Sequence, residues 1–309
     1  METFCLGNSQ AKYILIVWLL CFCSRMCQLG SAYPLNDPAT DDNNVSQGDR
    51  DIINLFSFGE KLFGRPNPEA GRKVREWTSD SVGLPEELGT YVEGDILHPQ
   101  TLARNGMKHE SFRWEGATIP YTISEAFDAQ DRKTIQLAMD QFHKLTCIRF
   151  VPRKFARQKD YIHIEMDQTG CWSSVGRIGG RQVVNLQSPG CLTTVGTPIH
   201  ELMHAVGFLH EQNRYERDNH VTIKWNNIQK GREINFEKAS ADTTDALGVP
   251  YDYRSVMHYS PYAFSVNKDP TIIPKVPNVD IGQRIGLSRK DVQKIYRMYK
   301  CEQYEKNIK

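Results

Sequence analysis

Three histidines and one glutamate stand at fixed offsets in one short segment of the chain. Residues 200–210 read HELMHAVGFLH, which is the pattern H-E-x-x-H-x-x-G-x-x-H. Residues four apart lie one turn above each other on the same face of a helix, so His200 and His204 could bind one metal ion. Gly207 can adopt a positive φ without steric cost, which would end the helix and bring His210 back as a third ligand. Three imidazoles and an open fourth position are typical of a catalytic zinc site.

Glu201 lies beside the expected ligand face, where its carboxylate could reach a water molecule held by the metal. The full string specifies five positions, and the chain has only 9 histidines in 309 residues. From composition, the string would arise by chance about once in 10,000 chains of this length or less often. A solvated helix that happens to be rich in histidine is therefore the weaker interpretation. The string predicts one Zn²⁺ per chain at a hydrolytic site.

A second motif, SVMHY at residues 255–259, follows the zinc string. Met257 fits the Met-turn that accompanies long zinc strings, because an apolar, adaptable thioether can lie under a metal site without competing for the zinc. The alternative for a methionine in a loop is plain packing. The phenol of Tyr259 could reach the metal or a developing oxyanion. Its alternative is a half-buried side chain with a satisfied hydroxyl.

The composition and the N-terminus indicate a secreted globular protein. The chain carries 38 basic and 37 acidic side chains, and a net charge of +1 argues against a nucleic-acid partner. Lys12 precedes an apolar run at residues 13–23, which is shorter than the roughly 20 residues that span a bilayer. We therefore interpret residues 1–32 as a signal peptide and expect no stable membrane anchor, an anchor being the weaker alternative. Asn44 begins an Asn-Val-Ser acceptor for N-glycosylation.

Four of the eight cysteines lie in or beside the signal peptide and would be removed with it. The four that remain are Cys147, Cys171, Cys191 and Cys301. In a secreted chain an even number of cysteines indicates disulfides, and four cysteines allow three pairings. Cys171 and Cys191 are the natural local pair, and Cys147 and Cys301 would then join the first half of the domain to its end.

The hydrophobic pattern predicts regular elements from about residue 114 onward. Strands are expected at 117–123, 147–151, 161–166 and 182–186, and helices at 128–145, from about 193 to the glycine of the zinc string, and at 288–299. The chain before residue 104 has no long periodic element, and little regular structure is expected between the zinc string and residue 288. We therefore predict an α+β fold, in which two helices back a twisted mixed sheet and an irregular C-terminal half completes the active-site cleft.

Taken together, these motifs closely resemble those of the astacin family of secreted zinc metalloendopeptidases, within the metzincins. The resemblance is carried by the blocks at residues 171–191, 200–218 and 281–301. It covers about residues 91–301. It implies a zincin-like catalytic domain at residues 105–309, preceded by a propeptide at residues 33–104. It also implies the disulfides Cys147–Cys301 and Cys171–Cys191.

The resemblance implies a role for each residue of the metal site. His200, His204 and His210 would bind zinc. Glu201 would act as the general base and then protonate the leaving amine. Tyr259 matches the family tyrosine that binds zinc in the resting enzyme and turns away to stabilise the tetrahedral intermediate. A catalytically silent zinc-containing binding protein is the alternative, but such a protein would lack the base or a ligand, and neither is missing here.

Residues 91–95, YVEGD, resemble the inhibitory motif of the family's propeptides, which is usually F-E-G-D. The family's aspartate occupies the zinc position of the catalytic water, which makes Asp95 the candidate latency switch. Tyr91 departs from the commoner phenylalanine. Without the zinc string, Gly94-Asp95 would be read simply as a turn.

Activation in the family follows cleavage ahead of the mature domain, and Arg104-Asn105 is the matching bond for an activating protease. The new amino terminus would then fold toward Glu211, since a buried ammonium needs an acidic partner; the alternative is a solvated carboxylate. Arg284 matches a position that shapes the S1′ pocket, where a guanidinium would favour an acidic P1′ side chain. Its alternative is a surface arginine. We expect protein or peptide substrates to pair with the strand at residues 181–186.

Overall fold

The computed structural model describes residues 62–99, 112–239 and 247–302. All of them fall in the unit formed by residues 45–309. The signal peptide predicted at residues 1–32, the sequon at Asn44 and the bond Arg104-Asn105 lie outside the described residues. Within the described ranges, no helix has both the length and the apolar character needed to cross a bilayer.

Four α-helices and nine strands form in the described part of the chain. The helices are α1 (Pro68–Glu76), α2 (Ala129–Leu145), α3 (Gly196–Val206) and α4 (Arg289–Tyr299). The strands are β1 (Phe63–Gly64), β2 (His98–Pro99), β3 (Thr118–Ile123), β4 (Arg149–Pro152), β5 (Tyr161–Glu165), β6 (Cys171–Ser173), β7 (Arg181–Leu186), β8 (Val221–Ile223) and β9 (Ile272–Pro274).

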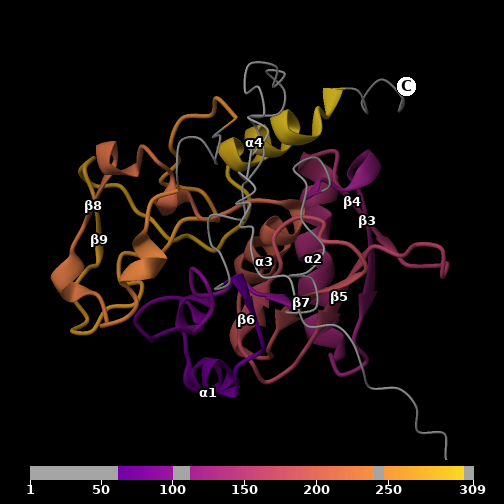
Figure 1. Cartoon of the computed structure of the whole chain (residues 1–309), viewed down its shortest axis with the longest axis horizontal. Helices are drawn as coiled ribbons and strands as arrows, with labels where there is room; N and C mark the ends of the chain where they lie inside the picture. The colour runs from indigo at the N-terminus through magenta and orange to yellow at the C-terminus, as the bar shows by residue number, and fades with distance from the viewer. Residues whose placement is uncertain (1–61, 100–111, 240–246, 303–309) are drawn as a thin grey trace, which may run out of the picture. The chain divides into compact units, whose positions relative to one another are not determined.

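A five-stranded sheet in the order β4-β3-β5-β7-β6 forms the frame of the molecule. The first four strands are parallel and β6 is antiparallel to β7, so the sheet is mixed as predicted. Helices α2 and α3 pack against each other and against the sheet, α2 on β4 and α3 on β6 and β7 (Figure 1). The predicted α+β fold with two helices on a mixed sheet is therefore confirmed.

Helix α2 shows why the long elements could be predicted. Asp128 caps its first turn, with its side chain accepting a hydrogen bond from the backbone N–H of Asp131 at 2.8 Å. Four apolar residues at helical spacing are fully buried or nearly so: Ile135, Ala138, Met139 and Phe142. Together they bury one apolar face of the helix in the main core, which fixes both the helix and its orientation on the sheet.

The short elements were not predicted: helix α1 and the two- or three-residue strands β1, β2, β6, β8 and β9. Helix α1 begins after the N-cap Asn67, with Pro68 in its first turn, but it has only nine residues and offers few apolar positions to a periodicity argument. Strand β6 has only three residues. Because β6 covers one edge of β7 and β5 covers the other, the expectation that residues 181–186 pair with substrate is wrong. The edge strand on this side of the sheet is β6.

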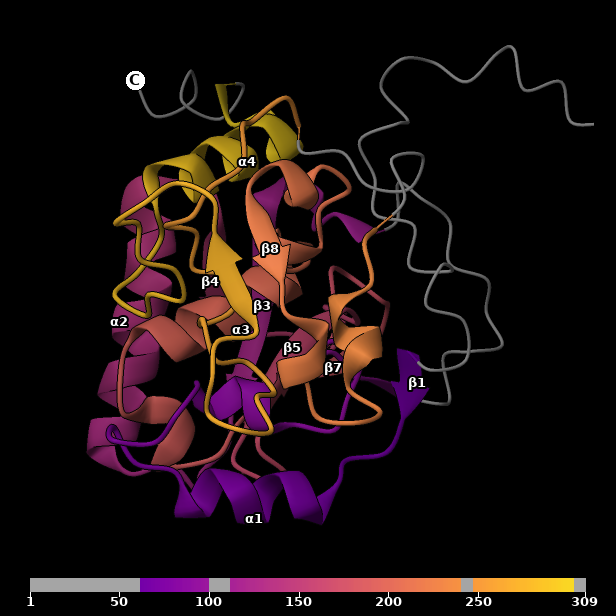
Figure 2. The same cartoon turned by 90° about the vertical axis from the view of Figure 1, so that its left-hand side faces the viewer.

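The C-terminal half has a smaller core of its own, to which Val221 and Ile223 of β8 and Ile272 of β9 contribute. These two strands form an antiparallel pair (Figure 2). Helix α4 closes this half. Ser288 and Asp291 form a capping box at its start, where the sequence predicted the helix to begin. The structure contains the two disulfides that the resemblance implies, and Cys147–Cys301 joins the end of α2 to the end of α4.

Candidate active site

Helix α3 carries the first two histidines of the zinc string, and Gly207 ends it. Gly207 has a φ of 125°, and its N–H donates to the carbonyl oxygens of Met203 and His204. A side chain at that φ would be strained, so the sharp reversal depends on glycine. The chain then turns back, and His210 joins His200 and His204 on the same side of the helix.

The three histidines converge on one carboxylate, that of Asp95. The Nε2 atoms of His200 and His210 lie 3.0 and 3.2 Å from Oδ2 of Asp95, and Nε2 of His204 lies 3.4 Å from its Oδ1. Nε2 of His200 and Nε2 of His210 are 3.1 Å apart. All four side chains are buried. Asp95 belongs to the N-terminal segment, the name used here for residues 62–99.

The opposite ring nitrogen of each histidine is held by an acceptor. Nδ1 of His200 donates to the carbonyl oxygen of Val256 at 2.8 Å, and Nδ1 of His204 donates to that of Phe208 at 2.7 Å. Nδ1 of His210 lies 2.6 Å from Oε2 of Glu93. Such contacts place the proton on Nδ1 and leave the Nε2 lone pair for a metal.

This donor set fits zinc. The four side chains each offer one ligand atom, and these atoms all lie within 4.8 Å of one another. Neither Oδ1 of Asp95 nor Nε2 of His204 has a hydrogen-bond partner among the described residues. Buried polar atoms that lack such a partner are costly unless something else binds them. Three imidazole nitrogens and one carboxylate oxygen are the ligands that zinc prefers.

The electric field at the centre favours a cation. Burial alone would lower the pKa of His210, but the carboxylates of Asp95 and Glu93 raise it to about 9. Burial opposes ionisation of Asp95 as well, yet His210 and His204 hold its pKa well below its usual range. The carboxylates of Asp95 and Glu93 thus stabilise positive charge at His210, and the same two groups would favour a bound metal cation.

Glu201 is fully buried beside the ligand face of α3, and neither of its carboxylate oxygens has a hydrogen-bond partner among the described residues. Burial and the nearby carboxylates of Asp95 and Glu86 raise its pKa well above the usual range. The side chain is therefore unrestrained by neighbouring donors, as a group that exchanges a proton with substrate or water must be.

The segment that holds Met257 and Tyr259 passes directly beside the histidines. Met257 is buried, and its carbonyl oxygen accepts from the N–H of Glu211 at 3.0 Å. The ring of Tyr259 packs against His210, with centroids 4.6 Å apart. Its hydroxyl donates to the backbone carbonyl of Glu93. Tyr259 is therefore fully buried rather than half-buried, and its hydroxyl is hydrogen-bonded to the N-terminal segment.

The backbone around Asp95 pairs with the edge of β6 that β7 does not cover. The N–H of Ser173 donates to the carbonyl oxygen of Asp95 at 2.9 Å, and the N–H of Leu97 donates to that of Ser173 at 3.0 Å. Ile96 and Ser173 form a parallel bridge. Tyr91 stands where the family motif usually has phenylalanine, and its additional hydroxyl makes two hydrogen bonds. It donates to the carbonyl oxygen of Thr169 at 2.7 Å and accepts from the N–H of Asn67.

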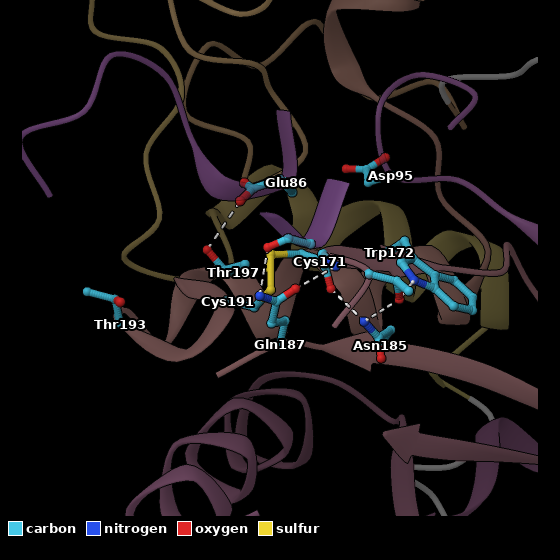
Figure 3. Close-up of a disulfide and its surroundings, with 12 residues drawn as sticks. Glu86, Asp95, Cys171, Trp172, Asn185, Gln187, Cys191, Thr193 and Thr197 are labelled. Carbon is cyan, nitrogen blue, oxygen red and sulfur yellow. Dashed lines mark hydrogen bonds between the residues drawn. A yellow bond between two sulfur atoms is a disulfide. The ribbon is translucent and has the colours of Figure 1, made fainter. Parts of the chain in front are cut away.

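Two consecutive glutamates of the N-terminal segment bind residues of the cleft. The guanidinium of Arg284 forms an ion pair with Glu86, and Thr197 at the start of α3 lies 3.4 Å from the same carboxylate (Figure 3). Glu87 accepts from the N–H of Ser260 at 2.6 Å and from its hydroxyl at 2.7 Å. Arg284 is buried, so the alternative of a surface arginine is wrong.

Sequence reasoning missed Glu86, Glu87 and Ser260. A Pro-Glu-Glu turn is ordinarily the solvated start of a helix, and nothing in the chain links it to residues about 170 or more positions away. The role of Glu93 toward His210 was also missed, although the residue lies inside the recognised motif.

Glu211 is only 3% exposed, so the alternative of a solvated carboxylate is wrong. Its carboxylate accepts from Nη1 of Arg214 at 2.9 Å and from the N–H of Asp252 at 2.8 Å, and it forms an ion pair with Lys294. Burial would raise its pKa, but Lys294 and Arg214 lower it. Asn105 lies outside the described residues, so the pairing of Glu211 with a new amino terminus stays a prediction.

Comparison with known proteins agrees with this geometry. The family model of Astacin, a family of peptidases, matches residues 106–300. Zinc metalloproteinase nas-4 of Caenorhabditis elegans is 38% identical over 293 residues, which cover 91% of this chain and 89% of that protein. Zinc metalloproteinase nas-13 of the same organism is 50% identical over 198 residues, 64% of this chain and 43% of its own length.

Among solved structures, high choriolytic enzyme 1, a hatching-enzyme zinc-protease from Oryzias latipes, is similar in fold. The TM-score is 0.58 and the sequences are 41% identical, over 64% of this chain and 100% of that one. The chain thus spans most of nas-4 but less than half of nas-13. From the family match and the histidine cluster together, the chain belongs to the astacin family and is a zinc metalloendopeptidase.

Proposed function

We propose that the full-length chain is a latent zymogen, with residues 33–104 as its propeptide and Asp95 as the residue that closes the active site. The observation that carries the proposal is the position of the Asp95 carboxylate, which faces the Nε2 atoms of His200, His204 and His210 at 3.0–3.4 Å. The same carboxylate cannot remain there while a substrate carbonyl and a water molecule occupy the site.

Zinc would be held by the three Nε2 atoms, and when bound it supplies Lewis acidity and lowers the pKa of a water molecule toward about 7. Glu201 accepts the proton of the attacking water and returns it to the leaving amine. The hydroxyl of Tyr259, released from the backbone of Glu93, donates to the oxyanion. The edge of β6 pairs with the extended substrate in place of residues 95–97.

Activation and secretion form part of the same proposal. An activating protease cleaves at or near Arg104-Asn105, and the new amino terminus meets Glu211, whose carboxylate already pairs with Arg214 and Lys294. Secretion is supported by the apolar run at residues 13–23 and by the two disulfides, which persist in oxidising compartments. Glycosylation at Asn44 would be compatible with that route.

The latency proposal predicts that Asp95→Ala raises the peptidase activity of the full-length protein by about tenfold or more. The substitution removes the carboxylate that contacts all three histidines, while the ion pair of Glu86 with Arg284 still holds the segment. Adding Glu86→Ala should raise the activity further. The measurement is the hydrolysis of a quenched fluorescent peptide before and after limited proteolysis.

Asp80→Ala is the matched control, because Asp80 is an exposed aspartate of the same segment. We expect its full-length form to be as inactive as the unsubstituted one. The zymogen proposal fails if the intact, unsubstituted chain is already as active as the proteolysed enzyme.

We further propose that Arg284 lies in the S1′ pocket and favours an acidic P1′ side chain. The ion pair between Arg284 and the carboxylate of Glu86 supports this, because a glutamate of the chain itself already occupies the guanidinium. Arg284 also donates to the backbone carbonyl of His258, which fixes the arginine side chain beside the segment that holds Met257 and Tyr259. A preorganised guanidinium binds a carboxylate strongly.

Arg284→Gln should lower kcat/KM for a peptide with Asp at P1′ by about 10- to 100-fold relative to the same peptide with Asn. Profiling of the activated enzyme with a peptide library measures the effect at every position. Arg289→Gln, at an exposed arginine nearby in sequence, should leave the profile unchanged. A library without enrichment of Asp or Glu at P1′ would contradict the assignment.

A further inference from the structure

Ser260 presents two donors to a single carboxylate. Its N–H donates to Oε1 of Glu87 at 2.6 Å and its hydroxyl donates to Oε2 at 2.7 Å. The hydroxyl oxygen in turn accepts from the N–H of Tyr262 at 3.2 Å, which orients its hydrogen toward the ligand. Both oxygens of the carboxylate are thus matched by donors from one residue, which is how proteins recognise an anion with defined geometry.

The backbone holds Ser260 at a fixed place beside Arg284. Gly282 has a φ of 80°, and a Cβ atom on it would lie 2.5 Å from the Cα atom of Ser260. The chains around residues 260 and 282 are therefore in direct contact, and Arg284 follows two residues later. Because Glu86 and Glu87 are consecutive, two neighbouring acidic side chains reach Arg284 and Ser260 at the same time.

The cavity that Glu87 lines also carries cationic side chains. A cavity of about 300 Å³ lies between the N-terminal segment and the C-terminal half, and Glu87, Arg232 and Lys268 are among its lining residues. The guanidinium of Arg232 packs over the ring of Phe264, 5.9 Å from its centroid, and has no acidic partner in the described part of the chain. Once the segment leaves, Arg232 and Lys268 remain in the part of the cleft that the side chain of Glu87 had lined.

We propose that Ser260 is a second carboxylate-binding point of the cleft, and that the activated enzyme selects peptides with a second acidic side chain at P2′ or P3′. This inference rests on the proposed S1′ role of Arg284, which sets the position of P1′. The charge of the ligand follows from the donors. The N–H and the hydroxyl of Ser260 donate to two oxygens of one group, and the hydroxyl oxygen already accepts from Tyr262, so a carboxylate fits better than an amide.

Glu87 also shows what opposes such binding in the closed form. Burial and the neighbouring carboxylate of Glu86 raise the pKa of Glu87 to about 7, while the hydrogen bonds from Ser260 lower it. Removal of the segment opens the cleft to solvent and so reduces the cost of burying a charge. A charged ligand at Ser260 is therefore opposed less by desolvation in the activated enzyme than Glu87 is in the closed chain.

The test uses the activated enzyme and pairs of peptides that differ only by Glu or Gln at P2′ or at P3′, each with Asp at P1′. We expect the unsubstituted enzyme to prefer the Glu peptide at one of these positions by about tenfold in kcat/KM, and Ser260→Ala to remove most of that preference. Ser124→Ala, which loses only a local contact to the N–H of Ala126, should retain it. An unchanged Glu-to-Gln ratio in Ser260→Ala would overturn the proposal.

A second measurement does not depend on the folding of that variant. A synthetic peptide of residues 84–97 should inhibit the unsubstituted enzyme, and its Ki should rise about tenfold on Glu87→Gln. An equal Ki for the two peptides would contradict a carboxylate-binding role for Ser260. The residue preference at P1′ in the peptide library reports separately on Arg284. If the library showed no preference at P1′ but a Glu preference that depends on Ser260, the S1′ assignment of Arg284 would be contradicted and the role of Ser260 supported.

Discussion

Glu201→Gln is expected to lower kcat for a peptide substrate by about 10³- to 10⁴-fold while zinc stays bound. Glutamine has nearly the same shape as glutamate but cannot accept a proton from an attacking water molecule. The carboxylate of Glu201 makes no hydrogen bond with the described residues, so its replacement leaves the ligands His200, His204 and His210 and their own acceptors in place. Activity is measured on the activated enzyme, and zinc content by elemental analysis of the same sample.

Glu125→Gln provides the control, because Glu125 is an exposed glutamate that precedes α2. Its rate and zinc content should equal those of the unsubstituted enzyme. If Glu201→Gln cleaved peptides at the unsubstituted rate, the general base would have to be another residue. If it lost zinc while remaining folded, Glu201 would have to act in metal binding instead.

Removing the disulfide Cys147–Cys301 should lower the free energy of unfolding more than removing the other disulfide does. The two cysteines are 154 residues apart, and the chain-entropy model assigns a loop of that size about 5 kcal/mol. That is comparable to the whole free energy of unfolding of many domains, about 5–15 kcal/mol. We expect the double variant Cys147→Ser/Cys301→Ser to unfold at much lower urea concentration than the unsubstituted protein.

The second disulfide supplies the comparison. Cys171 and Cys191 are 20 residues apart, for which the same model gives about 3 kcal/mol. Urea unfolding of the two double variants, followed by tryptophan fluorescence, should therefore rank Cys147–Cys301 as the more stabilising bond. The reverse order would show that constraint of the unfolded chain does not dominate at these sites.

The sequence was most informative where chemistry and structure depend on neighbours along the chain. The offsets of His200, His204, Gly207 and His210 are local, and one helix with a glycine end places all of them. Helix α2 was predicted nearly to its ends, because seventeen residues contain enough turns to reveal an apolar face. The disulfide pairs were also predicted: spacing made Cys171–Cys191 the natural local pair among three possible pairings, and the family resemblance implied the same bonds.

Long-range partners could not be predicted in this way. The contacts of Glu86 with Arg284 and of Glu87 with Ser260 join residues 198 and 173 positions apart. Nothing near either glutamate distinguishes it from a solvated one. Strand β6 was not predicted for a different reason, because three residues are too few to show an alternation of apolar and polar side chains. Because β6 was not predicted, we expected the substrate to pair with β7, but both edges of β7 are paired with other strands.

The pairing of residues 95–97 with the edge of β6 makes the N-terminal segment a ligand tethered to its own receptor. While the chain is intact, such a ligand competes at an effective concentration of order millimolar, whatever the concentration of the protein. Cleavage at Arg104-Asn105 would make the same contact bimolecular, so that dilution alone then favours departure of the segment. Latency in this protein would thus depend on the integrity of one peptide bond rather than on the strength of any single contact in the cleft.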